Sequence, residues 1–258
     1  MDISLHTNPP NLVTQYTLQS TNKALETTIE RIATGFKVNS VSDDAAGLQI
    51  ASRLEAQSRG MGVAMRNSQN AISMLQMAEG TMDEMTNIAF HMYELATQAA
   101  SGSNSEQDQE AMNSEFKALA EQLVNMQVST RFAGQHLLGP DGMFSEQGGV
   151  RFQVGSNSKD GLNVDVSDVV TAIFVVSQDL VSNYSILSQS EARASMDMLI
   201  GDSDESAGSG VVSILGFARS MFGAQINALD HNISNLENML ENLDEAKGRI
   251  VDNDISKA

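Results

Sequence analysis

The sequence predicts a mainly α-helical protein whose N-terminal and C-terminal segments form a long antiparallel helical rod resembling a coiled coil. Two long stretches carry apolar residues at alternating steps of three and four, which is the spacing of a helical seam. Only three prolines occur in 258 residues, and the chain has no tryptophan but 15 methionines. This composition favours closely packed helices over an aromatic-filled sandwich. A small β-hairpin region and a reduced variable region complete the predicted fold.

The first predicted helix covers residues 11–34. Its apolar residues lie on one face, at Leu18, Leu25, Ile29 and Ile32, and Gly35 follows as the expected C-cap. The three basic and three acidic residues up to Ser42 leave this segment without net charge.

Two adjacent carboxylates, Asp43 and Asp44, precede the second helical pattern. Carboxylates just ahead of a helix accept hydrogen bonds from its first amides and favour the positive end of its dipole. Catalytic pairs instead usually converge in a cleft that separates their pKa values. We therefore interpret Asn39, Ser42, Asp43, Asp44 and Gly47 as a helix start and not as an active site.

The second helical pattern runs from Asp43 to Ala99, which would be about 85 Å as one helix. Its seam is Leu75, Ala78, Met82, Met85, Ala89, Met92, Ala96 and Ala99. A helix of this length needs partner helices along its course. We expect Gly60 and Gly62 to weaken it locally, with a kink or break there.

The middle of the chain changes character. A polar turn at 101–109 precedes a third helix at about 107–129, which predicts an αα-hairpin. The runs VRFQV and LNVDV around SNSKDG predict a β-hairpin. Residues 170–210 could be a small sheet, a short helix or loop, and GDSDESAGSG within them is expected to be a solvated linker.

The C-terminal segment carries the strongest helical pattern. Its seam is Phe222, Ile226, Leu229, Ile233, Leu236, Leu240, Leu243, Lys247 and Ile250, in which Lys247 alone is polar.

Composition and missing motifs exclude several classes of function. A net charge of −18 argues against nucleic acid and anionic membrane surfaces. No apolar run is long enough for membrane insertion, no Sec-type signal begins the chain, and there are no cysteines. HExxH, GxSxG and phosphate-loop motifs are missing. We expect no enzyme activity, no catalytic or metal site and no cofactor.

Long motifs then identify a resemblance. ERIATGFKVNSVSDDAAGLQIASRLEAQSRGMGVAMRNSQNAISMLQMAEGTMDEMTNI, STRFAGQHLL, RFQVGSN and RSMFGAQINALDHNISNLENMLENLDEAKGRIVDND resemble bacterial flagellin. The opening SLHTN…LVTQYTL and GMGVAMRN are most similar to lateral, swarming-type flagellins. The resemblance covers nearly everything outside 170–210.

The resemblance implies a structural subunit of the flagellar filament that assembles with copies of itself for motility. It implies hook-associated and cap proteins as partners, an extracellular location, and type III export without a Sec signal. The implied domains are 1–42, the N-terminal segment of the inner filament-core domain; 43–169, the N-terminal part of the rod; 170–210, a reduced outer region; 211–250, the C-terminal rod helix; and 251–258, a stub of the C-terminal inner segment.

Three departures from the family are expected to matter. Typical flagellins continue for about one helix past the DND motif, so we expect this chain to assemble poorly, and binding of the export chaperone at that terminus is in question. The short outer region predicts a thin filament. The face that a vertebrate Toll-like receptor recognises corresponds to His91, Leu95, Gln98 and Glu115, where the family usually has Arg in place of His91. We therefore expect weakened sensing.

Three other interpretations remain. A flagellar hook–filament junction protein shares the paired ends, although the AAG after Asp44 favours flagellin. A flagellin that doubles as a zinc protease would need the missing HExxH. A generic coiled-coil module does not account for the long motifs.

Overall fold

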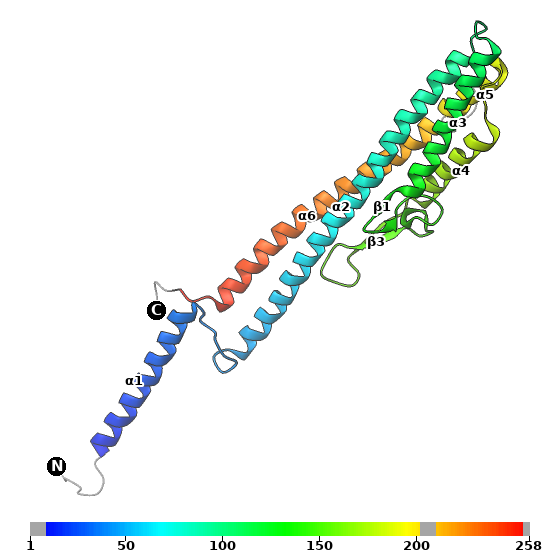
Figure 1. Ribbon diagram of the computed structural model, residues 1–258. Coiled ribbons are helices and arrows are strands. Elements are labelled where there is room, and N and C mark those ends of the chain that lie inside the picture. The colour runs from blue at the N-terminus through cyan, green and yellow to red at the C-terminus, as the bar shows by residue number, and fades with distance from the viewer. Residues whose placement is uncertain (1–8, 202–209, 255–258) are drawn as a thin grey trace. The chain divides into compact units, whose positions relative to one another are not determined.

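The protein is mainly helical, as predicted, and the computed structural model describes residues 9–201 and 210–254 (Figure 1). The helices are α1 (Pro9–Thr34), α2 (Ala45–Ala99), α3 (Glu106–Ser129), α4 (Ser167–Asn183), α5 (Gln189–Ile200) and α6 (Val211–Val251). Two short antiparallel hairpins join β1 (Arg131–Phe132) to β2 (Gln135–His136) and β3 (Val150–Gln153) to β4 (Gly161–Val164). A 3-10 turn, η1 (Met143–Ser145), lies between them.

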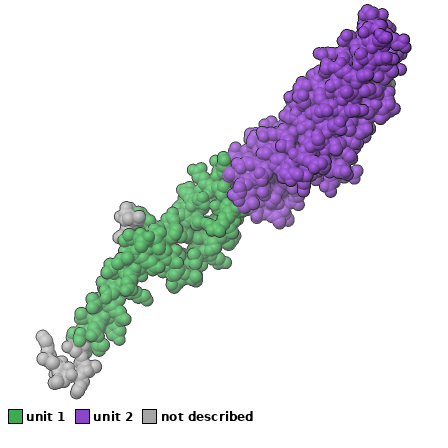
Figure 2. All heavy atoms as spheres, in the orientation of Figure 1, with its two compact units in different colours: residues 1–62, 237–258 green, residues 63–236 purple. Residues whose placement is uncertain are grey.

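The chain divides into two compact units, which Figure 2 colours separately. Unit 1 comprises residues 1–62 and 237–258, and unit 2 comprises residues 63–236. The unit boundaries fall inside α2 and α6, at different positions from the domain boundaries that we expected near residues 42 and 211.

Unit 2 is built on its portions of α2 and α6, which lie side by side and antiparallel (Figure 1). The guanidinium of Arg219 on α6 joins them by ion pairs of 2.8 Å to Glu79 and to Asp83 on α2. Phe222, also on α6, is fully buried and meets the Phe144 ring edge-to-face, with ring centroids 5.3 Å apart. The apolar core of this unit runs without interruption from the α2 seam through η1 to α6.

The third helix begins with a capping box. The Ser105 hydroxyl accepts a hydrogen bond from the Asp108 backbone amide, and the Asp108 carboxylate accepts one from the Ser105 amide. The hydrogen bonds from the Ser105 side chain and backbone hold the pKa of Asp108 below its usual value. This start turns the chain back along α2, which gives the predicted αα-hairpin (Figure 1).

Residues that the sequence left unassigned form two further helices of unit 2. The apolar face of α4 buries Val170, Ile173 and Leu180, and α4 packs against α3 and η1. The Ser188 hydroxyl caps the start of α5 at the Glu191 amide. The expected linker GDSDESAGSG falls largely on residues 202–209, which lie outside the described residues.

Both hairpins follow from turn chemistry, but only one was predicted. The expected hairpin pairs Val150 with Val164 and Gln153 with Gly161. The β1–β2 turn instead uses Ala133 at a φ of 49° and Gly134 at a φ of 88°. A turn with two positive φ values normally carries Asn-Gly or Asp-Gly. The Ala-Gly sequence of this turn therefore did not predict a hairpin.

The break expected at Gly60 and Gly62 does not occur, because α2 continues through both residues. Each glycine costs a helix about 1 kcal/mol relative to alanine. Met61, between the two glycines, and Ala64, two residues after Gly62, are 6% and 1% exposed. Burial of apolar side chains on this scale outweighs the propensity cost of the glycines.

Candidate assembly site

The loop between α1 and α2 is held by the end of α6 within unit 1. The amide of Gly35, at a φ of 76°, donates to the Arg31 carbonyl, so Gly35 closes α1 as the sequence predicted. The Lys37 amide then donates to the Val251 carbonyl at 2.6 Å, and the Asn253 amide donates to the Gly35 carbonyl at 2.9 Å. These bonds order a ten-residue connection that has no helix or strand of its own.

The two adjacent aspartates have separate structural roles in this loop. The Asp44 carboxylate accepts a hydrogen bond of 2.9 Å from the Gly47 amide, which is the N-cap interaction that begins α2. The Asp43 carboxylate faces the other way and accepts bonds from the amides of Ser40 and Asn39, at 2.9 and 3.1 Å. Those two backbone bonds, led by Ser40, lower the pKa of Asp43.

The other members of the predicted helix start lie around these aspartates. Ser42 shares a hydrogen bond of 2.7 Å with the Ser40 hydroxyl. Gly47 is buried, and a Cβ built there would lie 2.3 Å from the Asp44 carboxylate and 3.3 Å from Ile250 on α6. Glycine at this position therefore leaves room for the capping carboxylate beside α6.

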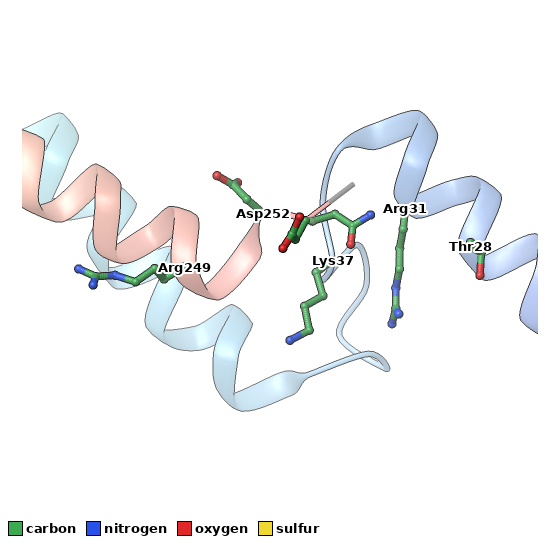
Figure 3. A pocket seen from close by; sticks show the side chains of 7 residues that line it. Thr28, Arg31, Lys37, Arg249 and Asp252 are labelled. Atoms are coloured by element: carbon green, nitrogen blue, oxygen red, sulfur yellow. The ribbon is translucent and has the colours of Figure 1, made fainter. Parts of the chain in front are cut away.

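A polar pocket of about 610 Å³ opens beside this loop in unit 1 (Figure 3), and we call it the loop pocket. It is lined by Thr28, Arg31, Lys37, Arg249, Asp252, Asn253 and Asp254. Figure 3 shows the Arg31 and Lys37 side chains extending in the same direction from α1 and from the loop.

Two donors of the loop pocket have no acceptor. The Arg31 Nε and the Asn253 Nδ2 are both buried atoms without a hydrogen-bond partner among the described residues. A buried donor left in this state costs about 1–3 kcal/mol. Sequence reasoning missed both residues, because only the tertiary structure brings the end of α1 next to the end of α6.

The apolar stripe of α1 is a second feature of unit 1. Leu18, Leu25, Ile29 and Ile32 are 62%, 56%, 57% and 50% exposed. No residue of α1 is buried. A 26-residue helix with exposed leucine and isoleucine is an open apolar face within the described part of the chain.

The predicted seam residues lie on the inner sides of α2 and α6. Met82, Met85 and Met92 are at most 1% exposed. The α6 members are buried or half-buried, namely Ile226, Leu229, Ile233, Leu236, Leu240, Leu243 and Ile250.

The one polar seam position, Lys247, is explained by its partner. The Lys247 ammonium donates to Glu55 on α2, which also pairs with Arg59. Both hydrogen bonds lower the pKa of Glu55, and the bond from Lys247 has the larger effect. An ion pair at one seam position favours a single register between α2 and α6 in unit 1.

The predicted receptor face is brought together only in part. His91 on α2 and Glu115 on α3 are exposed, and the His91 Nε2 lies 3.7 Å from a Glu115 carboxylate oxygen. Gln98 is also exposed. Leu95, however, is 7% exposed and belongs to the core of unit 2. A receptor would therefore meet three of the four side chains.

The described residues contain neither a candidate metal cluster nor a candidate membrane span. Within 9–201 and 210–254, no group of three or more His, Asp or Glu side chains is placed to hold a metal ion. No helix in these ranges combines the length and apolar character that a membrane span needs.

Comparisons with known proteins place these features in context. The sequence profile of the bacterial flagellin N-terminal helical region matches residues 5–141. Flagellin of Halalkalibacterium halodurans is 37% identical over 230 residues, which are 89% of this chain and 78% of that protein. Flagellin C of Vibrio cholerae is 41% identical over 169 residues, so the match spans 66% of this chain and 44% of the relative's length.

Two solved structures share the fold. The crystal structure of Bacillus cereus flagellin matches 66% of this chain and 88% of its own, with a TM-score of 0.54 and 24% identity. A putative flagellar hook-associated protein from Vibrio parahaemolyticus matches 81% of this chain and all of its own, with a TM-score of 0.61 and 16% identity. At these identities the likeness concerns the fold alone.

Proposed function

Since the chain belongs to the bacterial flagellin family and is a structural subunit of the flagellar filament, we propose that it polymerises through the exposed stripe of α1. The observation that carries this proposal is that α1 buries none of its apolar side chains. An isolated helix gains most of its stability from packing its apolar face. Copies of the chain that pack their α1 helices together would supply that packing.

The domain assignment follows from the same proposal. Residues 1–42 would form the inner part of the filament, and 43–169 with 211–250 would form the rod around it. The charge distribution supports this division. Residues 1–42 have 3 basic and 3 acidic residues and no net charge, whereas 43–169 and 211–250 together have 10 basic and 22 acidic residues, a net charge of −12. Nearly neutral surfaces can approach one another at a crowded axis, whereas strongly acidic ones repel.

Immunogold labelling would test the filament role against the junction-protein alternative. An epitope inserted at Lys159, in the exposed loop between β3 and β4, leaves both strands intact. We expect gold particles along the whole filament of the bacterium that encodes the chain. Labelling confined to the base of the filament would instead favour the hook–filament junction protein.

Partners and export are also proposals. The family implies contact with hook-associated and cap proteins, and export without a Sec signal to the extracellular filament. The resemblance of the opening segment to lateral flagellins stays a proposal, which loss of swarming on agar after gene deletion would support.

We propose weakened recognition by the flagellin-sensing Toll-like receptor. A histidine at position 91 lacks the permanent, forked donor of an arginine, although its Nε2 lies 3.7 Å from a Glu115 carboxylate oxygen. The His91→Arg variant should therefore activate reporter cells at a concentration about tenfold lower, the effect of one hydrogen bond to a charged group. Equal potency of the variant and the unaltered chain would contradict the proposal.

A further inference from the structure

We propose that the loop pocket receives a carboxylate side chain of a second copy of this chain. This inference rests on the proposed filament role and names a specific contact within it. The pocket combines cations, unpaired buried donors and a free volume of about 610 Å³, and all three belong to unit 1.

The pocket contains buried hydrogen-bond donors that have no acceptor within the described part of the chain. The Arg31 Nε and the Asn253 Nδ2 are buried and unpaired. A carboxylate is the matching group, because its two oxygens only accept hydrogen bonds and can bind a guanidinium through two of its N–H groups. Thr28, at the same wall, uses its hydroxyl to donate to the Ala24 carbonyl.

The charges of the pocket favour an anion as well. Neither Arg31 nor Lys37 forms an ion pair within the described residues. Arg249 has only a solvent-exposed partner, Glu245, at 3.4 Å. The lining carboxylates of Asp252 and Asp254 are on exposed residues. The charge of Arg31 also helps to lower the pKa of Asp43 without an ion pair, so neither Arg31 nor Lys37 is paired directly with a carboxylate among the described residues.

The composition of the chain favours a second copy as the source of this carboxylate. Unit 2 carries 21 of the 33 acidic residues but only 7 of the 15 basic ones. Many of its carboxylates are exposed on α2 and α3, including Glu84, Glu94, Glu106, Glu110 and Glu121. In the proposed filament, such acidic surfaces of one copy would lie next to unit 1 of another copy. Burial of the pair between two copies would also make it less sensitive to screening by salt than a surface ion pair.

The first arm of the test measures elongation. The product of the complete gene, purified as monomer, is added to filament seeds, and the critical concentration is determined at 50 and 500 mM NaCl. The double variant Arg31→Gln/Lys37→Gln should raise the critical concentration at low salt by about tenfold, and salt should change it less than in the unaltered protein. The matched control, Lys23→Gln/Arg53→Gln, removes two cations of unit 1 outside the pocket and should change it little.

The second arm works on the monomer and does not depend on polymerisation. Citrate is titrated into ¹⁵N-labelled protein at constant ionic strength, and the side-chain signals of Arg31 Nε and Asn253 Nδ2 are followed. Both signals should shift in the unaltered protein. The Asn253 signal should stay unchanged in Arg31→Gln/Lys37→Gln, which carries no cation at these two positions.

The two arms of the test distinguish a failure of the pocket proposal from a failure of the filament role. Citrate-induced shifts with normal elongation of the double variant would mean that the pocket holds small anions only, which overturns the inference. Normal elongation without shifts also overturns it, and leaves the filament role intact. If the unaltered protein adds to no seed, the filament role itself fails, and the second copy as occupant fails with it.

Discussion

Replacing Leu25 and Ile29 by aspartate should abolish filament formation and leave the folded monomer unchanged. Both side chains are more than half exposed on the stripe of α1, so no packed core is lost in the monomer. In a filament each would bury apolar area worth about 1.5–3 kcal/mol per side chain. The double variant loses that contribution and places two unpaired charges in the contact. Electron microscopy of cells carrying the variant at the native locus measures the result.

A matched control occupies the opposite face of the same helix. Ser20→Asp/Thr27→Asp introduces the same two charges, and we expect normal filaments from it. The melting temperature of the purified monomers should agree among the unaltered chain and both double variants, because α1 contributes no buried residue. Filaments of normal length from Leu25→Asp/Ile29→Asp would refute the assembly role of the α1 stripe.

Of the substitutions proposed for this protein, Phe222→Ala should lower the free energy of unfolding the most. Phe222 is fully buried in unit 2, where its ring meets that of Phe144. Removing a buried phenylalanine ring costs about 3–5 kcal/mol, which includes the cavity that remains. For a unit of this size the melting temperature should fall by on the order of 10 °C. Urea denaturation followed by circular dichroism measures the loss directly.

The same helix supplies the control for that experiment. Phe217 on α6 is 61% exposed, so Phe217→Ala should change the free energy of unfolding by less than about 0.5 kcal/mol. Equal losses in the two variants would show that burial in unit 2 does not determine the stability of this part of α6.

Asp43 and Asp44 illustrate what helix-capping preferences can and cannot predict. The sequence predicted that both carboxylates serve a helix start and do no chemistry. Asp44 does cap α2, but Asp43 binds the amides of Ser40 and Asn39 in the preceding loop. Capping preferences depend on residue type and local spacing, so they predict that a helix begins here. They do not predict which of two neighbouring carboxylates turns toward the helix.

Helix α4 was not predicted from the sequence pattern. Its apolar residues, such as Val170, Ile173 and Leu180, face a core that α3 and η1 supply. Val166, the residue before α4, forms no side-chain cap, and the Asp165 carboxylate accepts hydrogen bonds from the Ser167 amide and hydroxyl. Short helices of this kind gain their stability from packing, which a local sequence pattern does not contain.

What the sequence determined by itself was the helical class, the long seams of α2 and α6, the predicted hairpin, and, through its motifs, the flagellin family. Such properties depend on the spacing of residues along one element. Only the tertiary structure decided that α1 leaves its stripe exposed and that Arg31 and Asn253 meet with unpaired donors in one pocket. The pocket joins segments more than 200 residues apart in the chain, whose proximity arises from folding and leaves no local signal.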